Sequence, residues 1–423
     1  MAKLTAFFEL QDRISAKIEN ITKKTEKYTE ASERLAKAGA VAFAAVGAAA
    51  VGAGGYAVNK FIQFEDKMNE VFTLLPDLSD QAMKDMTGQV KKFSKDFGVL
   101  PEKVVPALYQ SISAGVSKDN VFDFMAIAQK AAVGGVTQLE TAVDGITSVV
   151  NAYGADVLSA AKASDLMFTA VKMGKTDFTQ LSQSLYNVIP TASALGVQFG
   201  DITAAMASMT AQGTPTSVAT TQMRQLLVEL SKAGGKPAAM FEELSGKTFK
   251  DFIAGGGNVQ QALQLMEKQA KSMDIGINDL FGSVEAGNAA LALTGKGTEM
   301  YSNNLKEMAN SAGATDAAYQ RMQKGIAKSI DKITANLSVM VLEAGERLAP
   351  SVARFADYII SVMPAIQAAV GEAFDFILNA VGFVADHFEI IGPAVAAAVL
   401  TIIIPSFIAW AKTAWATAAA NLA

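Results

Sequence analysis

The sequence predicts an all-α fold with an N-terminal coiled-coil helix, a compact multi-helix core domain and extended C-terminal helices with hydrophobic segments. Apolar residues recur every three or four positions along most of the 423 residues. Glycine and proline cut the middle of the chain into segments of about 12 to 20 residues, the usual length of globular helices. No segment alternates apolar and polar residues long enough to require a strand. We divide the chain into residues 1–37, 38–60, 61–235, 236–316, 317–389 and 390–423.

Residues 1–37 are charged and polar, unlike a secretory signal, and carry an apolar seam with a period of 3.5 residues. This spacing predicts a coiled-coil helix, and an amphipathic helix lying on its own domain is the alternative. The seam consists of Leu4, Phe7, Gln11, Ile14, Ile18, Ile21, Thr25, Tyr28, Ser32 and Leu35.

Residues 38–59 form a charge-free block between Lys37 and Lys60. The block has the roughly 20 residues that a membrane-spanning helix needs, but alanine and glycine contribute little hydrophobic transfer energy. Ala48 and Gly52, four residues apart, would let helices approach closely. We therefore expect an Ala/Gly-rich hydrophobic helix packed against identical copies or an enclosing wall, with membrane entry as a later step.

Residues 61–235 are expected to form the compact core. Capping residues are predicted at Asp119, at Thr137 with Glu140 in capping-box spacing, and at Thr176. Four glycines are interpreted as architectural positions that favour positive φ, not as ligand contacts: Gly115, Gly134, Gly174 and Gly213. Breaks between helices are expected at Leu75–Asp77, Gly98, Gly115, Gly134–Gly135, Gly154, Gly174, Gly196, Gly200 and Gly213–Pro215.

Residues 236–316 are interpreted as a linker and helical subdomain. The stretch Lys232–Gly257 is rich in glycine, and helices are expected at Val259–Ser272 and Ile277–Thr294.

Residues 317–389 are predicted to be long amphipathic helices that kink or restart at Pro350 and Pro364. A second seam with 3.5-residue spacing runs along this segment, through Ile326, Ile330, Ile333, Leu337, Met340 and Ala344, and Leu348 follows.

The second charge-free block, Ile390–Ala411, lies between Glu389 and Lys412 and is the stronger transmembrane prediction. Trp410 and Trp415 stand at one end, where interfacial aromatic residues belong. The alternative is a helical hairpin buried in an oligomer.

Composition excludes several classes of function. A net charge of −5 offers no basic surface for nucleic acid, and the chain contains no cysteine, which excludes disulfides, cysteine-ligated zinc and thiol nucleophiles. A chain without cysteine suits the reducing cytoplasm.

Four sequence features imitate known sites. Gly52–Ala57 has the spacing of a dinucleotide-binding motif but follows no strand. Ser245–Thr248 ends like a phosphate-binding loop, but its first glycine is replaced by Phe241. The single histidine, His387, has no partner pattern, and Glu343 and Glu346 fit a solvated helix face. We therefore predict no catalytic, cofactor-binding or metal-binding residue, no cofactor and no enzymatic activity.

A series of segments, in order and without large gaps, resembles the core region of bacteriophage tail tape-measure proteins. These segments, within residues 64–230, are Phe64–Val71, Phe97–Ser117, Ala131–Gly154, Phe168–Phe178, Ser184–Val197 and Met209–Leu227. The resemblance implies a ruler and scaffold inside the tail tube that sets tail length and is ejected on infection to help the genome cross the host membrane.

The same resemblance implies several partners: the major tail-tube protein, tail assembly chaperones, distal tail or baseplate proteins, further copies of the chain and, after ejection, the host inner membrane. The expected locations are the virion tail lumen, the host cytoplasm during assembly and the host membrane through the hydrophobic segments. Family members are often longer, so we expect a short tail or an incomplete or prophage-derived copy. A pore-forming or membrane-inserting helical protein unrelated to tails is the alternative.

Overall fold

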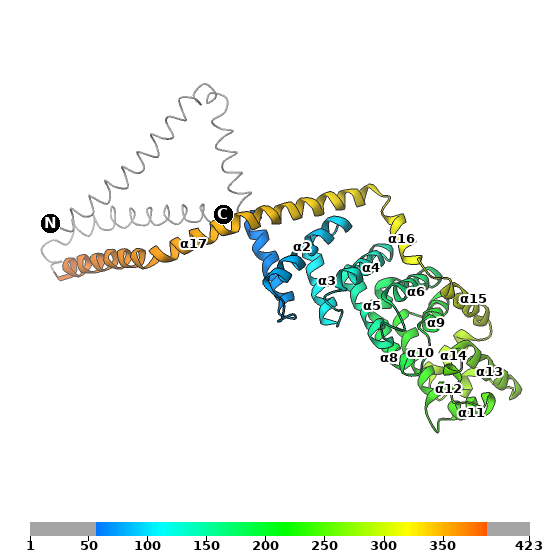
Figure 1. Ribbon diagram of the computed structural model, residues 1–423. Coiled ribbons are helices and arrows are strands. Elements are labelled where there is room, and N and C mark those ends of the chain that lie inside the picture. The colour runs from blue at the N-terminus through cyan, green and yellow to red at the C-terminus, as the bar shows by residue number, and fades with distance from the viewer. Residues whose placement is uncertain (1–55, 387–423) are drawn as a thin grey trace. The chain divides into compact units, whose positions relative to one another are not determined.

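A computed structural model describes residues 56–386, and all regular elements in this range are helices (Figure 1). The all-α prediction is therefore confirmed for this part of the chain. Residues 63–340 form one compact unit, and residues 56–62 and 341–386 belong to a second. The N-terminal seam, residues 38–55 of the first charge-free block, the whole second charge-free block, His387, Trp410 and Trp415 lie outside the described residues, so the predictions made for them stay predictions. Residues 56–59 of the first block are helical.

The helices of the compact unit follow one another through short turns, after an initial helix that ends at residue 72. Those of the first half are α2 (Asp80–Phe97), α3 (Pro101–Ser113), α4 (Val121–Gly134), α5 (Leu139–Tyr153), α6 (Ala160–Met173), α7 (Phe178–Ser184), η1 (Leu185–Asn187), α8 (Ile189–Ala194) and α9 (Phe199–Ala211). Those of the second half are α10 (Thr216–Ser231), α11 (Lys236–Ser245), α12 (Phe249–Ala254), α13 (Val259–Ser272), η2 (Ile277–Leu280), α14 (Val284–Leu293), α15 (Gly297–Ala309) and α16 (Ala314–Met322).

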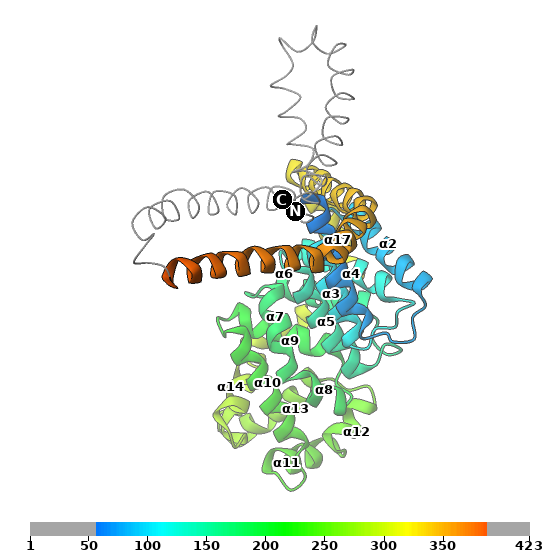
Figure 2. The ribbon, with the colours of Figure 1, turned by 90° about the vertical axis from the view of Figure 1, so that its left-hand side faces the viewer.

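Helix α9 is the centre of this unit and packs against α6, α10, α14 and α15 (Figures 1 and 2). Every residue from Ile202 to Thr210 is buried. Small side chains in this stretch let neighbouring helices approach closely. The buried hydroxyl of Ser208 donates to the carbonyl of Ala204 and receives Nδ2 of Asn304 at 2.9 Å, so a polar bond also ties α15 to the core.

Glycine ends helices here for two different reasons. Gly115 and Gly213 have φ of 91° and 99°, as the sequence predicted, and this backbone conformation is strained for other residues. Gly134 and Gly174 do not adopt positive φ, so the prediction is wrong for them. A Cβ atom at Gly134 would lie 3.0 Å from Cβ of Ala318, so that glycine is required by close packing. Gly200 lies inside the first turn of α9 and marks no break.

The three predicted caps are displaced by one residue. The N-cap residues are Asn120, Gln138 and Asp177, in place of Asp119, Thr137 and Thr176. Gln138 makes no side-chain capping bond, so the capping box with Glu140 does not form. For the two threonines the reason is tertiary, because the hydroxyls of Thr137 and Thr176 are bonded to threonines on α7 and α10.

Residues 236–293 contain α11, α12, α13, η2 and α14. Phe241 is fully buried and meets the rings of Phe249 and Phe252 with centroids 5.7 and 5.3 Å away, which fastens α11 to α12. The helix predicted at Val259–Ser272 is confirmed with these bounds. The helix predicted at Ile277–Thr294 is divided into η2 and α14, because the backbone is extended at Phe281.

Helix α17 (Ile326–Asp386) contains 61 residues, so it is about 90 Å long at 1.5 Å per residue. It continues through Pro350 and Pro364, so the helix does not restart there, and the kink given as the other outcome stays a prediction. A proline inside a helix removes one N–H donor, and the exposed position of Pro350 lets water satisfy the acceptor left behind. In the second unit, Gly345 allows α17 to contact the backbone of Ala57 and the side chain of Phe61, with no room for a Cβ atom.

Candidate functional site

Threonine hydroxyls join three turns and the starts of the helices that follow them, and the three turns lie in segments that carry the family resemblance. They join α4 to α5, α6 to α7, and α9 to α10. Oγ1 of Thr137 lies 2.7 Å from Oγ1 of Thr179, and Oγ1 of Thr176 lies 2.7 Å from Oγ1 of Thr216. The hydroxyl of Thr216 also donates to the side-chain oxygen of Gln180 at 3.2 Å. The resemblance therefore marks a packed structural cluster that binds consecutive helical hairpins to one another.

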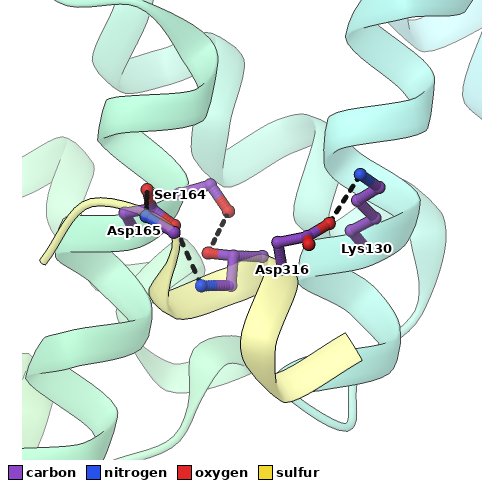
Figure 3. Close-up of polar contacts among 6 residues, drawn as sticks. Lys130, Ser164, Asp165 and Asp316 are labelled. Atoms are coloured by element: carbon purple, nitrogen blue, oxygen red, sulfur yellow. Dashed lines mark hydrogen bonds and ion pairs between the residues drawn. The ribbon is translucent and has the colours of Figure 1, made fainter. Parts of the chain in front are cut away.

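Helix α16 is held by a buried carboxylate from α6, which Figure 3 shows together with its neighbours. The two carboxylate oxygens of Asp165 accept the backbone N–H groups of Gly313 at 2.7 Å and of Thr315 at 2.9 Å. The neighbouring Ser164 shares a hydroxyl hydrogen bond of 2.9 Å with Thr315. Ser164, Asp165 and Thr315 are all buried. Asp165 thus caps the N-terminus of α16 from another helix, where a negative charge also complements the helix dipole.

The remaining contacts of α16 surround this buried bond. Nζ of Lys130 on α4 forms an ion pair of 2.7 Å with Asp316, and both side chains are more than one third exposed. Tyr319 lies against Phe97 with ring centroids 6.3 Å apart. We call the contacts of residues 313–319 with α2, α4 and α6 the α16 junction. This junction joins α16 to helices that lie far earlier in the chain, and α17 begins shortly after it.

A second carboxylate performs the same task for α14. Glu229 on α10 accepts the N–H groups of Gly282 at 2.6 Å and Ser283 at 3.0 Å, and the hydroxyl of Ser283 at 2.5 Å. Burial acts to raise the pKa of this carboxyl, but the hydrogen bonds from residues 282 and 283 and from Gln225 outweigh burial and hold its pKa below the ordinary value. Glu229 is therefore a charged anchor for α14.

A cavity of about 920 Å³ lies between the ends of α5, α6, α9, α13 and α15. Asp201 lines the cavity, and burial raises its pKa to about 6, although its hydrogen bond from the N–H of Val259 acts in the opposite direction. Burial, and secondarily the charge of Asp201, also raises the pKa of Tyr153 and Tyr301. Their hydroxyls donate to the carbonyls of Val197 and Asp201. These polar groups are satisfied by the protein itself.

The sequence features that imitate known sites have structural roles where the structure describes them. Gly246 has φ of 71° and ends α11, and Thr248 caps α12 by accepting the N–H of Asp251, so Ser245–Thr248 is a helix junction. Glu346 is exposed and Glu343 half-buried. Within residues 56–386, no three metal-ligating side chains gather, and no helix combines the length and the hydropathy needed to cross a bilayer.

Asp165 and Glu229 were not recognised from the sequence. The one available signal was an acidic residue on the apolar face of a helix, as Asp165 lies beside Ala163 and Leu166. Their partners are 148 and 53 residues away and could not be assigned without a structure.

Comparison with known proteins shows the family to which the chain belongs. A model of the phage-related minor tail protein family matches residues 87–282. The probable tape measure protein of Clostridium phage phiCD119 (strain Clostridium difficile/United States/Govind/2006) is 31% identical over 334 residues, which is 76% of this chain. The chain belongs to the phage tail tape-measure family. No solved structure matches it.

The chain spans about a third of the length of this relative, of which 35% is aligned. The family match contains the threonine-linked turns and both anchoring carboxylates, whereas the part of the α16 junction at residues 313–319 lies beyond it. The structure thus extends the compact unit past the region that the family model recognises.

Proposed function

We propose that this chain acts as a tail tape measure: a scaffold and ruler in the lumen of the tail tube that sets tail length during assembly. The observation that carries the proposal is the 31% identity, over 334 residues, to a protein described as a probable tape measure protein. Helix α17 supports it mechanically, because an uninterrupted helix of 61 residues converts residue number into distance at a fixed 1.5 Å per residue.

The proposed partners follow from this placement. The major tail-tube protein would polymerise around the chain, assembly chaperones would cover its apolar surfaces in the host cytoplasm, and distal tail or baseplate proteins would hold one end. Several copies would lie together in the tube. On ejection, the predicted hydrophobic segments 38–59 and 390–411 would enter the host inner membrane and assist genome passage.

We propose further that the chain performs no bond-making or bond-breaking and uses no cofactor or metal. The motifs that imitate catalytic or nucleotide sites lack the required context, and the carboxylates of Asp165 and Glu229 accept hydrogen bonds from backbone N–H groups. The chain would then act only through its shape and length.

The test is the dependence of tail length on helix length. In the phage that encodes this chain, whole heptads of α17 between residues 326 and 361 are deleted in frame, and tails are measured by electron microscopy. Each deleted heptad should shorten the tail by about 10 Å, since seven residues rise 1.5 Å each. The matched control replaces the same heptads with helical sequence of equal length, which should leave tail length unchanged. Tails of wild-type length after the deletions would refute the ruler.

A further inference from the structure

Helix α16 buries little of its own surface. Two of its nine residues, Thr315 and Tyr319, are buried, whereas α9 buries ten of thirteen. Tyr319 supplies the ring contact with Phe97, and both side chains of the ion pair between Asp316 and Lys130 are more than one third exposed. Detaching α16 would therefore expose little apolar surface, and the free energy needed to open a segment rises with the apolar surface that opening exposes.

The buried hydrogen bonds of α16 are made by groups that water can also satisfy. The carboxylate of Asp165 accepts the N–H groups of Gly313 and Thr315 (Figure 3). The hydroxyls of Ser164 and Thr315 share a further hydrogen bond. Burial deprives the carboxylate of its hydration, and the two N–H groups replace that hydration in the folded chain. When α16 detaches, water returns to the same groups, so part of the lost hydrogen bonding is recovered.

A glycine stands at each end of α16. Gly313 precedes the helix with φ of 79°, and Gly325 is exposed between α16 and α17. A Cβ atom at either position would meet no neighbouring atom within 4 Å, so the surrounding chain leaves room for movement. Because glycine has the widest range of backbone conformations, rotation at these two residues would swing α16 as one rigid helix.

The helices beneath α16 form a stack that is held together without it. Helices α3, α5, α7 and α10 begin at residues 101, 139, 178 and 216, and α4, α6 and α9 begin at residues 121, 160 and 199. One helical hairpin therefore follows another every 38 or 39 residues, and equivalent helices pack directly, α3 on α5, α4 on α6 and α6 on α9. We call α3–α10 the hairpin stack. Helix α16 lies across α4 and α6, outside this repeat (Figure 1).

We propose that α16 is a reversible latch: in the folded protein it detaches from α4 and α6 as one helix, pivots at Gly313 and Gly325, and returns, while the hairpin stack stays folded. The inference goes beyond the proposed function, which requires no movement within the compact unit. Since α17 follows α16 after residues 323–325, each opening uncouples the beginning of α17 from α4 and α6.

Thiol labelling of the full-length chain tests whether α16 opens before the stack does, because the chain contains no cysteine of its own. Ser164→Cys places a thiol under α16, and the matched control Ser111→Cys places one on α3. Both serines are fully buried. A thiol-specific reagent reacts at either position only when the local structure opens. Ser164→Cys should be labelled at least about tenfold faster than Ser111→Cys in the absence of denaturant.

The dependence of labelling on urea identifies the kind of opening. The labelling rate of Ser164→Cys should change little at low urea concentration, because detachment of α16 exposes little surface. The rate for Ser111→Cys should rise steeply with urea, as expected for opening of the whole stack. Equal rates with the same urea dependence would show that α16 leaves only when the compact unit unfolds, and would overturn the proposal.

A thiol on α16 itself separates detachment of the helix from fraying. Thr315→Cys, at a buried position of α16, should be labelled within about threefold of the rate for Ser164→Cys, because one opening event uncovers both. Labelling at residue 315 while residue 164 stays protected would show that α16 frays without leaving the stack, and the latch would be rejected.

The wild-type chain provides a second measurement that does not depend on the folding of any variant. In native-state hydrogen exchange at low urea, the amides of α16 should exchange through an opening that depends weakly on urea. The amides of α4 and α6 should exchange more slowly, with a steeper dependence. One common urea dependence for α16, α4 and α6 would refute the latch.

Discussion

The most informative perturbation of the compact unit is Asp165→Ala, which removes the cap of α16 without changing any surface. The substitution leaves the N–H group of Gly313 and the buried N–H group of Thr315 without their acceptor. It also removes the carboxylate that holds Thr315 beside Ser164. A hydrogen bond to a charged group contributes about 1.5–3 kcal/mol, and a lost cap costs about 1 kcal/mol. Because the two bonds share one carboxylate, we expect a loss of about 3 kcal/mol.

The matched control is Lys130→Ala, which breaks the neighbouring ion pair with Asp316. Both of these side chains are more than one third exposed, so the pair contributes about 0.5 kcal/mol or less. The two substitutions therefore affect the same helix, one through a buried bond and one through a solvated pair, and should differ severalfold in effect.

The assay is hydrogen exchange of the α16 amides, supported by urea denaturation followed by circular dichroism. Asp165→Ala should accelerate exchange in residues 314–322 by about 100-fold, the factor that corresponds to roughly 3 kcal/mol when exchange follows local opening. Asp165→Asn should lie between the two, since its amide oxygen still accepts one bond. If Asp165→Ala changes exchange no more than Lys130→Ala does, then the α16 junction is not held by this carboxylate and the reasoning fails.

Three further predictions concern the core. Gly174→Ala should destabilise the compact unit by about 2 kcal/mol in urea denaturation, because the new Cβ would lie 2.5 Å from Oγ1 of Thr210. The control is Gly88→Ala, where the new Cβ within α2 meets open space, and it should stabilise the unit by about 0.5–1 kcal/mol in the same assay. Asp201→Asn should raise the free energy of unfolding near pH 7.5 by up to about 3 kcal/mol and leave it unchanged near pH 3. The reason is that the pKa of Asp201 in the folded state, about 6, lies above the ordinary value of 3.8, so the stability of the wild type falls as pH rises between these values. Melting curves of variant and wild type that coincide at both pH values would contradict this. Glu229→Gln should lower the free energy of unfolding by about 1 kcal/mol at neutral pH. The difference in stability between variant and wild type should shrink on acidification, because a carboxyl with a lowered pKa stabilises the fold only while it is ionised. A difference that stays constant down to pH 3 would refute this.

Local patterns could be predicted from the sequence, and long-range bonds could not. The bounds of α13 and the positive φ at Gly115 follow from periodicity and from the conformational freedom of glycine, both of which are local. Thr137 illustrates the limit. Its spacing to Glu140 fits a capping box, but its hydroxyl is bonded to Thr179 on another helix, a partner that no local rule supplies.

The same distinction applies to the anchoring carboxylates. Asp165 would ordinarily be assigned to a solvated helix face, because aspartate is rarely buried without a partner. Its partners become visible only when residues 313–315 are folded against α6. The seam at Ile326–Met340 is the opposite case: the heptad was read from the sequence, and the structure added that this face is exposed while the opposite face is buried.

The order of elements in the chain has a consequence for synthesis. Asp165 and Ser164 leave the ribosome about 150 residues before the groups that satisfy them. Until residue 315 emerges, a nascent chain carries the Asp165 carboxylate on the buried face of α6 without the backbone N–H groups that donate to it in the folded unit. We therefore expect the compact unit to complete this part of its packing only after α16 has been synthesised, and most of α17 is synthesised later still.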